Sequence, residues 1–283
     1  MFGDRAIVDI KSTEYQRIMN IYGETVGYDY LSRINSTIRK TIQLAQSDKI
    51  VLDDFTSNVE LFAGKEAQKN EEKYIHSVED YHRLVNYLEK QLDYETTVIY
   101  HVLYIIAKTG MRYGEAIGIT DDDTKLEDHY LYTHRRYNTT TWGWTKAKND
   151  TSIRAVPIDN KTIEIITELR KEQIHVNAIL ERTNKEKFLF FHYGLEHDIP
   201  SVATANKALK NILNELNIQP VITTKGLRHT YGSYLLHNNV DMGVVAKILG
   251  HKDIQMLIKV YGPTMTERID KEFKEVESIM DRL

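Results

Sequence analysis

The sequence predicts a mainly α-helical protein that carries one small antiparallel sheet, which is an α+β fold class. Long stretches repeat apolar residues with the 3.6-residue period of an α-helix, and only 4 of the 283 residues are prolines. Residues 125–158 differ, because Tyr, Thr, Trp, Ile and Val alternate there with polar residues, as in β-strands. We expect two or three strands in this stretch, with a turn at Lys148–Asp150.

The first 59 residues are expected to form a small helical domain. Its first helix is predicted in STEYQRIMNIYG, with Ser12 or Thr13 as the N-cap and Gly23 as the stop. The next segment, YDYLSRINSTIRKTIQLAQSD, places five apolar residues on one helical face: Leu31, Ile34, Ile38, Ile42 and Ala45. Residues 60–76 contain the polar run GKEAQKNEEK and are predicted to be a linker.

A second, larger domain is predicted over residues 77–265. Ser77 and Asp80 have the spacing of a capping box, and ETTVIYHVLYIIAKTG reads as a buried helix that Gly110 ends. After the sheet, a short FLFF strand is expected between two helices, and three more helices follow. The expected helices are 160–182, 202–217, 226–238, 241–249 and 253–261. Gly262-Pro263 is a hard stop, and residues 266–283 form an amphipathic C-terminal helix.

The composition narrows the class of protein. The 37 Lys and Arg residues against 41 Asp and Glu residues give a net charge of −4, which does not announce a nucleic-acid binder but is compatible with a local basic groove. With no cysteine, the chain has neither disulfides nor thiolate metal sites. No apolar run reaches membrane-spanning length, and MFGDRAIVDIKSTEY carries charges where a secretory signal would be apolar. We expect a cytoplasmic protein without a membrane partner.

Cationic or nucleophilic side chains recur at the ends of the predicted elements. Four segments carry them: TGMRYGEA with Arg112, TKAKNDTSIRAVPI with Lys146 or Lys148, TTKGLRHT with Lys225 and Arg228, and LGHKDIQMLIKVYGP with His251 and Tyr261. Taken singly, each also fits an ordinary role, such as a surface arginine, a solvated lysine, a capping histidine or one of 18 tyrosines. Since side chains at element ends can converge, the four together predict one site.

In this order, the segments resemble the tyrosine recombinases, the phage integrase family of site-specific DNA recombinases. TGMRYGEAIGI is similar to the family's segment with the first catalytic arginine, and KGLRHTYGSYLL to the segment with the second. LGHKDIQMLIKVYG is similar to the LGH box and the nucleophilic tyrosine that follows it. Three ordered boxes are more specific than one short motif. The resemblance covers roughly residues 77–265 and is fainter in the first domain, which is expected to be a partial or minimal core-DNA-binding domain.

The resemblance implies strand exchange through a 3′-phosphotyrosine intermediate. Tyr261 would attack the scissile phosphate and release a 5′-hydroxyl. Arg112 and Arg228 would bind that phosphate, because a planar guanidinium can hold two oxygens at once. Lys225 and His251 would be further donors. Clustered cations favour the tyrosinate and stabilise the charge that develops on the phosphate.

Four other residues enter through the same resemblance. The family protonates the leaving oxygen with a lysine of the hairpin, for which Lys146 fits best and Lys148 is the alternative. Glu115 is expected to orient the arginines, and His229 to support them. The chain departs from the family at Lys225, where a histidine is usual. A lysine keeps the hydrogen bonds and the charge, but it makes proton transfer from this position doubtful.

The expected partners and cofactors also follow from the resemblance. These are double-stranded DNA attachment sites, a homotetramer on DNA and DNA-bending accessory proteins, with no cofactor and no metal. Residues 266–283 would be exchanged between protomers, or would pack on their own domain. A type IB topoisomerase-like activity and a non-catalytic DNA-binding relic stay open as alternatives. The short length and the LGH box argue against the first, and the intact set Arg112, Arg228, His251 and Tyr261 against the second.

Other basic residues invite a DNA-contact interpretation. Arg33, Arg39 and Lys40 lie on the second predicted helix, where an exposed face explains them equally well. Arg135 and Arg136 lie in HRRYNTTTWGW, where two solvated arginines on a packed sheet are as plausible as a DNA contact. We assign no site to these residues.

Overall fold

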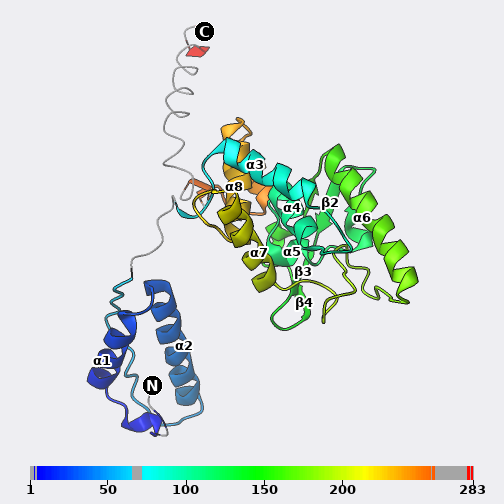
Figure 1. Ribbon diagram of the computed structural model, residues 1–283. Coiled ribbons are helices and arrows are strands. Elements are labelled where there is room, and N and C mark those ends of the chain that lie inside the picture. The colour runs from blue at the N-terminus through cyan, green and yellow to red at the C-terminus, as the bar shows by residue number, and fades with distance from the viewer. Residues whose placement is uncertain are drawn as a thin grey trace. The chain divides into compact units, whose positions relative to one another are not determined.

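A computed structural model of the chain describes Gly3 and residues 5–65, 72–255, 257–258, 279–280 and 282. The chain divides into two compact units, Met1–Lys69 and Asn70–Leu283 (Figure 1). The division falls within the polar segment predicted as a linker. Both ends of that segment belong to the units, because Leu61 packs on the apolar cluster of the first unit, and Tyr74 and Ile75 are buried in the second.

The first unit is built on two helices that lie side by side, α1 (Ser12–Gly23) and α2 (Tyr28–Ser47) (Figure 1). The predicted apolar face of α2 is confirmed, since its residues are buried or packed on the cluster of this unit. The predicted N-cap was wrong, because Lys11 takes that position and Ser12 is the first helical residue. Gly23 ends α1 where a Cβ would lie 2.0 Å from the carbonyl oxygen of Phe62, so close packing requires a glycine here.

The second unit contains most of the helices and both sheets, as the predicted α+β class requires. Ser77 Oγ accepts a hydrogen bond from the N–H of Asp80 at 3.0 Å, which confirms the predicted cap. The apolar helix α4 lies against α3, α7 and α8, with residues 101–107 all buried. The helices are α3 (Val78–Lys90), α4 (Ile99–Thr109), α5 (Tyr113–Ala116), α6 (Asn160–Ile179), α7 (Val202–Glu215), α8 (Thr224–His237) and α9 (Met242–Leu249). None of the helices in the described part of the chain could cross a membrane.

The predicted single sheet is two sheets. One has the order β1-β2-β5 and the other pairs β3 with β4, all antiparallel. The strands are β1 (Thr124–Lys125), β2 (Tyr130–Thr133), β3 (Arg135–Asn138), β4 (Gly143–Lys146) and β5 (Arg154–Pro157). Lys148–Asp150 lies in the connection from β4 to β5 rather than in a hairpin turn. The hairpin turn follows β3, where Asn138 Oδ1 accepts from the N–H of Thr140 at 2.8 Å.

Two other predictions need correction. Phe188–Phe191 is a buried turn with one isolated β-bridge, between Phe188 and Thr120, and not a strand. The N–H of Leu189 donates to the carbonyl of Ile119 at 2.8 Å, and side chains supply the donors for other carbonyls. Gln173 Nε2 donates to the carbonyl oxygens of Leu189 and Phe191 at 2.8 and 3.1 Å. Helix α8 begins at Thr224, two residues before the predicted start at 226, so Lys225 lies on the helix together with Arg228 and His229. In the predicted helix 253–261, residues 255, 257 and 258 are helical, while 256 and 259–261 lie outside the described residues. Gly262-Pro263 and most of residues 266–283 also lie outside them.

Candidate active site

The TGMR segment caps helix α4. Gly110 adopts a φ of 63°, and its N–H donates to the carbonyl of Ile106 at 2.9 Å. A Cβ at this position would lie 2.5 Å from Cδ1 of Tyr231, so glycine is required both for the left-handed backbone and for contact with α8. The chain then leaves α4 in an extended conformation and places Arg112 at the N-cap of α5.

The LGH segment caps helix α9 with a Schellman motif. Gly250 has a φ of 61°, and its N–H donates to the carbonyl of Lys247 at 3.1 Å. The N–H of His251 donates to the carbonyl of Ala246 at 2.9 Å, which fixes the backbone of the histidine against the helix end. The carbonyls that follow in sequence belong to Ile248, Leu249 and Gly250, and the helix itself offers them no donors.

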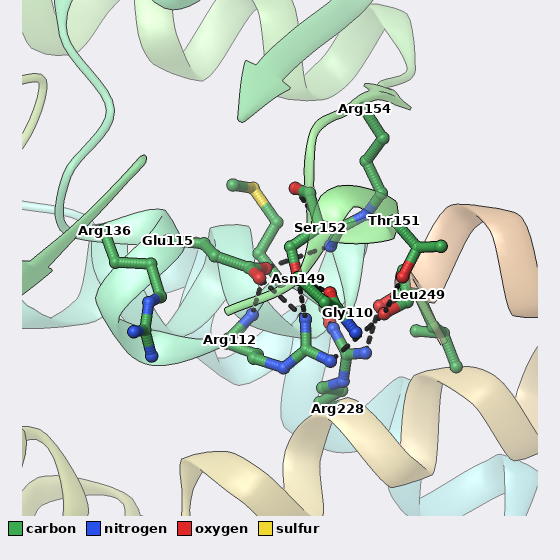
Figure 2. A network of polar contacts seen from close by, with 12 residues as sticks. Gly110, Arg112, Glu115, Arg136, Asn149, Thr151, Ser152, Arg154, Arg228 and Leu249 are labelled. Atoms are coloured by element: carbon green, nitrogen blue, oxygen red, sulfur yellow. Dashed lines mark hydrogen bonds and ion pairs between the residues drawn. The ribbon is translucent and has the colours of Figure 1, made fainter. Parts of the chain in front are cut away.

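Three arginines supply those donors, one to each carbonyl, and Figure 2 shows Arg228 beside Leu249. Arg154 Nε donates to Ile248 at 2.6 Å, Arg112 Nη2 donates to Gly250 at 3.2 Å, and Arg228 Nη2 donates to Leu249. Arg228 Nη1 also donates to the carbonyl of Gly110 at 2.8 Å, which links the ends of α4 and α9. The negative end of the α9 dipole therefore gathers three guanidinium groups beside His251.

Glu115 is the carboxylate of this cluster, and its side chain is fully buried. It accepts from Arg112 Nη1 at 2.7 Å, from the N–H of Arg112 at 3.0 Å and from Arg154 Nη2 at 3.0 Å. Burial alone would raise the pKa of Glu115, but the charges of Arg154, Arg112 and Arg228 outweigh it and hold the pKa below its usual value. Glu115 is therefore ionised and joins two of the three arginines.

The connection from β4 to β5 docks on the same cluster. Ser152 Oγ accepts from Arg112 Nη1 at 3.3 Å and donates to Asn149 Oδ1. Lys146, at the end of β4, and Lys148 are both exposed. They line one shallow cavity of about 660 Å³ that also includes Arg135 and Trp144. In the described part of the chain, neither lysine side chain joins the arginine hydrogen bonds, so the structure places both nearby without choosing between them.

Lys225 and His229 lie on the first two turns of α8, one turn apart, and Lys225 is exposed. Burial and the charges of Lys225, Arg228 and Lys73 lower the pKa of His229 to about 4. Burial and the charges of Arg228 and Arg112 lower the pKa of His251 to about 4 as well. Both imidazoles are therefore neutral near pH 7 in the free protein. The Nδ1 atom of His251 is buried and has no hydrogen-bond partner among the described residues.

These depressed pKa values predict a loss of stability in mild acid. Burial also lowers the pKa of His101 to about 4. An unfolded histidine titrates near 6.5, so between about pH 6.5 and 4 the unfolded chain binds more protons than the folded one, and protonation favours unfolding. Urea titrations should show the free energy of unfolding falling by roughly 2–4 kcal/mol from pH 7 to pH 5. The His101→Gln variant should lose less over the same range, and a pH-independent free energy would contradict the account.

Sequence reasoning missed Arg154, whose side chain is 5% exposed and forms an ion pair with Glu115. The sequence of β5 did contain a signal for this residue. In RAVP the inward-facing positions of β5 are Arg154 and Val156, while Ala155 and Pro157 face outward. An arginine on the core face of a strand requires an acidic partner, and Glu115 provides it.

The other basic residues have structural contacts. Arg39 donates to the carbonyl and the hydroxyl of Thr56 at 2.6 and 3.1 Å, so it holds a loop of the first unit. Arg135 stacks over the ring of Trp144 at 3.8 Å, and Arg136 Nε donates to the carbonyl of Lys146 at 3.1 Å. Figure 2 shows Arg136 to one side of the cluster. Tyr261 lies outside the described residues.

The second unit thus has the fold of a tyrosine-recombinase catalytic domain, with the arginine and histidine boxes joined at one point. The model of the phage integrase family matches residues 76–267, and the chain belongs to this family. The integrase of Staphylococcus phage L54a is 26% identical over 174 residues, which are 60% of this chain and 48% of that protein. The chain thus spans about half of that relative's length.

Other relatives and solved structures agree on the fold. The tyrosine recombinase XerD of Staphylococcus haemolyticus is 26% identical over 230 residues, covering 79% of this chain and 68% of that protein. The Tn1549 transposon integrase bound to transposon right-end DNA has a TM-score of 0.68 at 16% identity, covering 95% of this chain and 88% of that one. The XerH site-specific recombinase in a post-cleavage complex with palindromic difH substrate has a TM-score of 0.68 at 15% identity, with 98% and 76% covered.

Proposed function

We propose that this chain is a site-specific DNA recombinase that cleaves and rejoins DNA through a 3′-phosphotyrosine intermediate. The observation that carries the proposal is the convergence of cationic donors at one helix end. The guanidinium groups of Arg112, Arg154 and Arg228 all donate to carbonyls at the end of α9, directly before His251. Guanidinium groups gathered beside a partly exposed arginine, Arg112, fit an anion that arrives from outside. A scissile phosphate is such an anion.

The cluster can bind that phosphate without being dismantled. A guanidinium has five N–H donors, and the contacts of Arg112 with Glu115, Ser152 and Gly250 use three. Its side chain is 25% exposed, so its remaining donors can reach a ligand. Arg228 and Lys225 add charge from α8, and His251 adds a neutral donor at the end of α9. Tyr261 follows on the same chain segment and is our candidate nucleophile.

The phosphate would also change the state of His251. In the free protein, burial and the neighbouring arginines keep its pKa at about 4. A bound phosphate brings negative charge that offsets those arginines, and it raises the tendency of His251 to hold a proton. The histidine thus becomes a stronger donor to the phosphate only after DNA is in place, while Glu115 and the arginines keep their charges throughout.

Lys146 is our candidate for the proton donor to the 5′-oxygen, with Lys148 as the alternative. Replacing the correct lysine by alanine should slow cleavage of normal DNA by about 10²–10⁴-fold. A sulfur in the 5′-bridging position leaves without a proton, so such DNA should be cleaved by that variant at nearly the wild-type rate. Lys146→Ala and Lys148→Ala serve as controls for each other. Rescue of Lys148→Ala alone would assign the role to Lys148, and rescue of neither would exclude both.

Partners and assembly follow from the family. Duplex DNA with paired attachment sites is the proposed substrate, and the first unit is proposed to bind it together with the second. Strand exchange would take place in a homotetramer, with DNA-bending proteins assisting and residues 266–283 docking on a neighbouring protomer. Deleting these residues should reduce pairing of two sites more than binding to one site, as measured by native gel electrophoresis. Equal losses would instead indicate that the segment packs on its own domain.

The function is tested by incubating the protein with nicked duplexes taken from the boundaries of the mobile element or prophage that encodes it. A nick beside the cleavage site lets a short fragment diffuse away, so the covalent complex accumulates. The expected result is a denaturant-resistant band with protein on the 3′-phosphate. Normal DNA binding without such a band would favour a non-catalytic DNA-binding protein. Relaxation of supercoiled DNA without exchange between sites would favour topoisomerase-like activity.

A further inference from the structure

We propose that Arg154 is a positioning residue of this site, which locks Glu115 and the end of α9 in the geometry that presents Arg112, Arg228 and His251 to one phosphate. The inference rests on the proposed function and deepens it, because it assigns a task to a residue outside the proposed phosphate contacts.

Arg154 joins three parts of the second unit. Its nitrogen atoms donate to acceptors in α9, in α5 and in the connection from β4 to β5, and Figure 2 shows Arg154 near Glu115 and Ser152. Nε donates to the carbonyl of Ile248 in α9 at 2.6 Å, and Nη2 donates to Glu115 in α5 at 3.0 Å. Nη1 donates to the carbonyl of Ser152 at 3.0 Å, in the connection from β4 to β5. One guanidinium therefore joins α5, which Arg112 caps, the end of α9 before His251, and the β4–β5 connection that contains Lys148.

Arg154 is fixed and enclosed. Its side chain is 5% exposed, and Nε, Nη1 and Nη2 all donate to protein acceptors. Its backbone belongs to β5, where it pairs with Thr133 in the sheet β1-β2-β5. Strand β5 also contacts α9. Because the guanidinium of Arg154 is anchored on the sheet β1-β2-β5, it holds the end of α9 rigidly. A side chain that orients other side chains must itself be held in this way.

The end of α9 packs closely against the guanidinium of Arg154. A Cβ added at Gly250 would lie 2.9 Å from Nη1 of Arg154, so the backbone just before His251 rests almost directly on the guanidinium. Glu115 accepts from the guanidinium of Arg112 through Oε1, and from Arg154 and the backbone N–H of Arg112 through Oε2. If Arg154 were shortened, the carboxylate could rotate toward Arg112, and the carbonyl of Ile248 would lose its donor. Both Arg112 and His251 would then shift relative to the phosphate.

The test compares Arg154→Lys with Arg170→Lys. A lysine keeps the charge of Arg154 but is a point donor without the planar fork, so it cannot satisfy acceptors in three directions. Arg170 is a matched control in the same unit, because it donates to Asp121 and Thr124 away from the cluster. Three quantities are measured for each: the thermal unfolding midpoint, the Kd for a duplex site, and the rate of covalent attachment to a nicked duplex at saturating DNA.

For folded Arg154→Lys we expect a Kd within about 3-fold of wild type and attachment about 10²-fold slower, since misplacement by about 1 Å costs this much. Arg170→Lys should match wild type in both. A second measurement is a double-mutant cycle that combines Arg154→Lys with Glu115→Gln. If Arg154 acts through Glu115, the double variant should attach to DNA about as slowly as the slower single variant, within about 3-fold. If the two residues acted independently, their losses in attachment rate would multiply.

Three results would overturn the inference: wild-type attachment by folded Arg154→Lys, multiplicative losses in the cycle, or failure of Arg154→Lys to fold, which would make Arg154 a residue of stability alone. The proposed function would survive each of these if wild type and Arg170→Lys still formed the covalent complex. If wild type itself formed none, the proposed function would fail first.

Discussion

Replacing Tyr261 by phenylalanine is expected to abolish covalent attachment to DNA, a loss of at least about 10⁴-fold, while the Kd for a duplex site changes by less than about 3-fold. The phenol oxygen is the only atom removed, and it is the atom that would form the bond to phosphorus. A phenol with an ordinary pKa near 10 attacks poorly at pH 7, so its reactivity depends on the surrounding cations. The measurement is the denaturant-resistant band on a nicked duplex, quantified over time.

The matched control is Tyr132→Phe, because Tyr132 is an exposed tyrosine in β2, at 37% exposure. It should form the covalent complex at the wild-type rate. With 18 tyrosines in the chain, a band that persisted in Tyr261→Phe would mean that another tyrosine is the nucleophile. Loss of DNA binding together with the band would mean that Tyr261 has a structural role.

Arg228→Ala is expected to lower both attachment and stability. Its guanidinium donates to the carbonyls of Gly110 and Leu249, and the residue is 4% exposed. Alanine leaves these two buried acceptors without their arginine donor, which should cost about 2–4 kcal/mol in the free energy of unfolding. Removing a preorganised charge from the phosphate should also slow attachment by about 10²–10³-fold at saturating DNA. Urea titration and single-turnover assays measure the two effects.

Arg83→Ala is the control for Arg228→Ala. Arg83 also donates to a carbonyl at a helix end, that of Leu216 at 2.7 Å, but its side chain is 47% exposed and remote from the boxes. For Arg83→Ala we expect the free energy of unfolding to change by less than about 1 kcal/mol and the rate of covalent attachment to stay the same. Slower attachment by Arg228→Ala without any loss of stability would contradict the hydrogen bonds to α4 and α9. Loss of stability without slower attachment would contradict its place in the phosphate site.

The parts of the fold that local chemistry determines could be predicted from sequence. Ser77 caps α3, Gly110 ends α4 with a positive φ, and the apolar stripe of α2 packs inward, as the periodicity indicated. The site was predictable to the same degree. Arg112, Arg228 and His251 meet because the TGMR and LGH segments are both helix caps whose carbonyls bind the arginines. A cap is readable from a few residues, and the resemblance supplied their order.

The features that depend on contacts between distant residues could not be predicted in this way. Alternation identifies strands but not partners, so the division into two sheets and the pairing of β2 with β5 were missed. The apolar run Phe188–Phe191 has the composition of a strand, yet it forms one isolated bridge, to Thr120, and Gln173 of α6 donates to the carbonyls of Leu189 and Phe191. Arg154 was missed because its partners, Glu115 and Ile248, are remote in sequence.

The most direct test of the central claim is an experimental structure of the Tyr261→Phe variant bound to an uncleaved duplex of its own site. The account predicts that Arg112, Arg228 and His251 donate to oxygens of one phosphate, at about 2.7–3.2 Å, with residue 261 facing the phosphorus opposite the 5′-oxygen. A duplex seated on another surface, with the three side chains away from any phosphate and only their contacts at the ends of α4 and α9 intact, would contradict it.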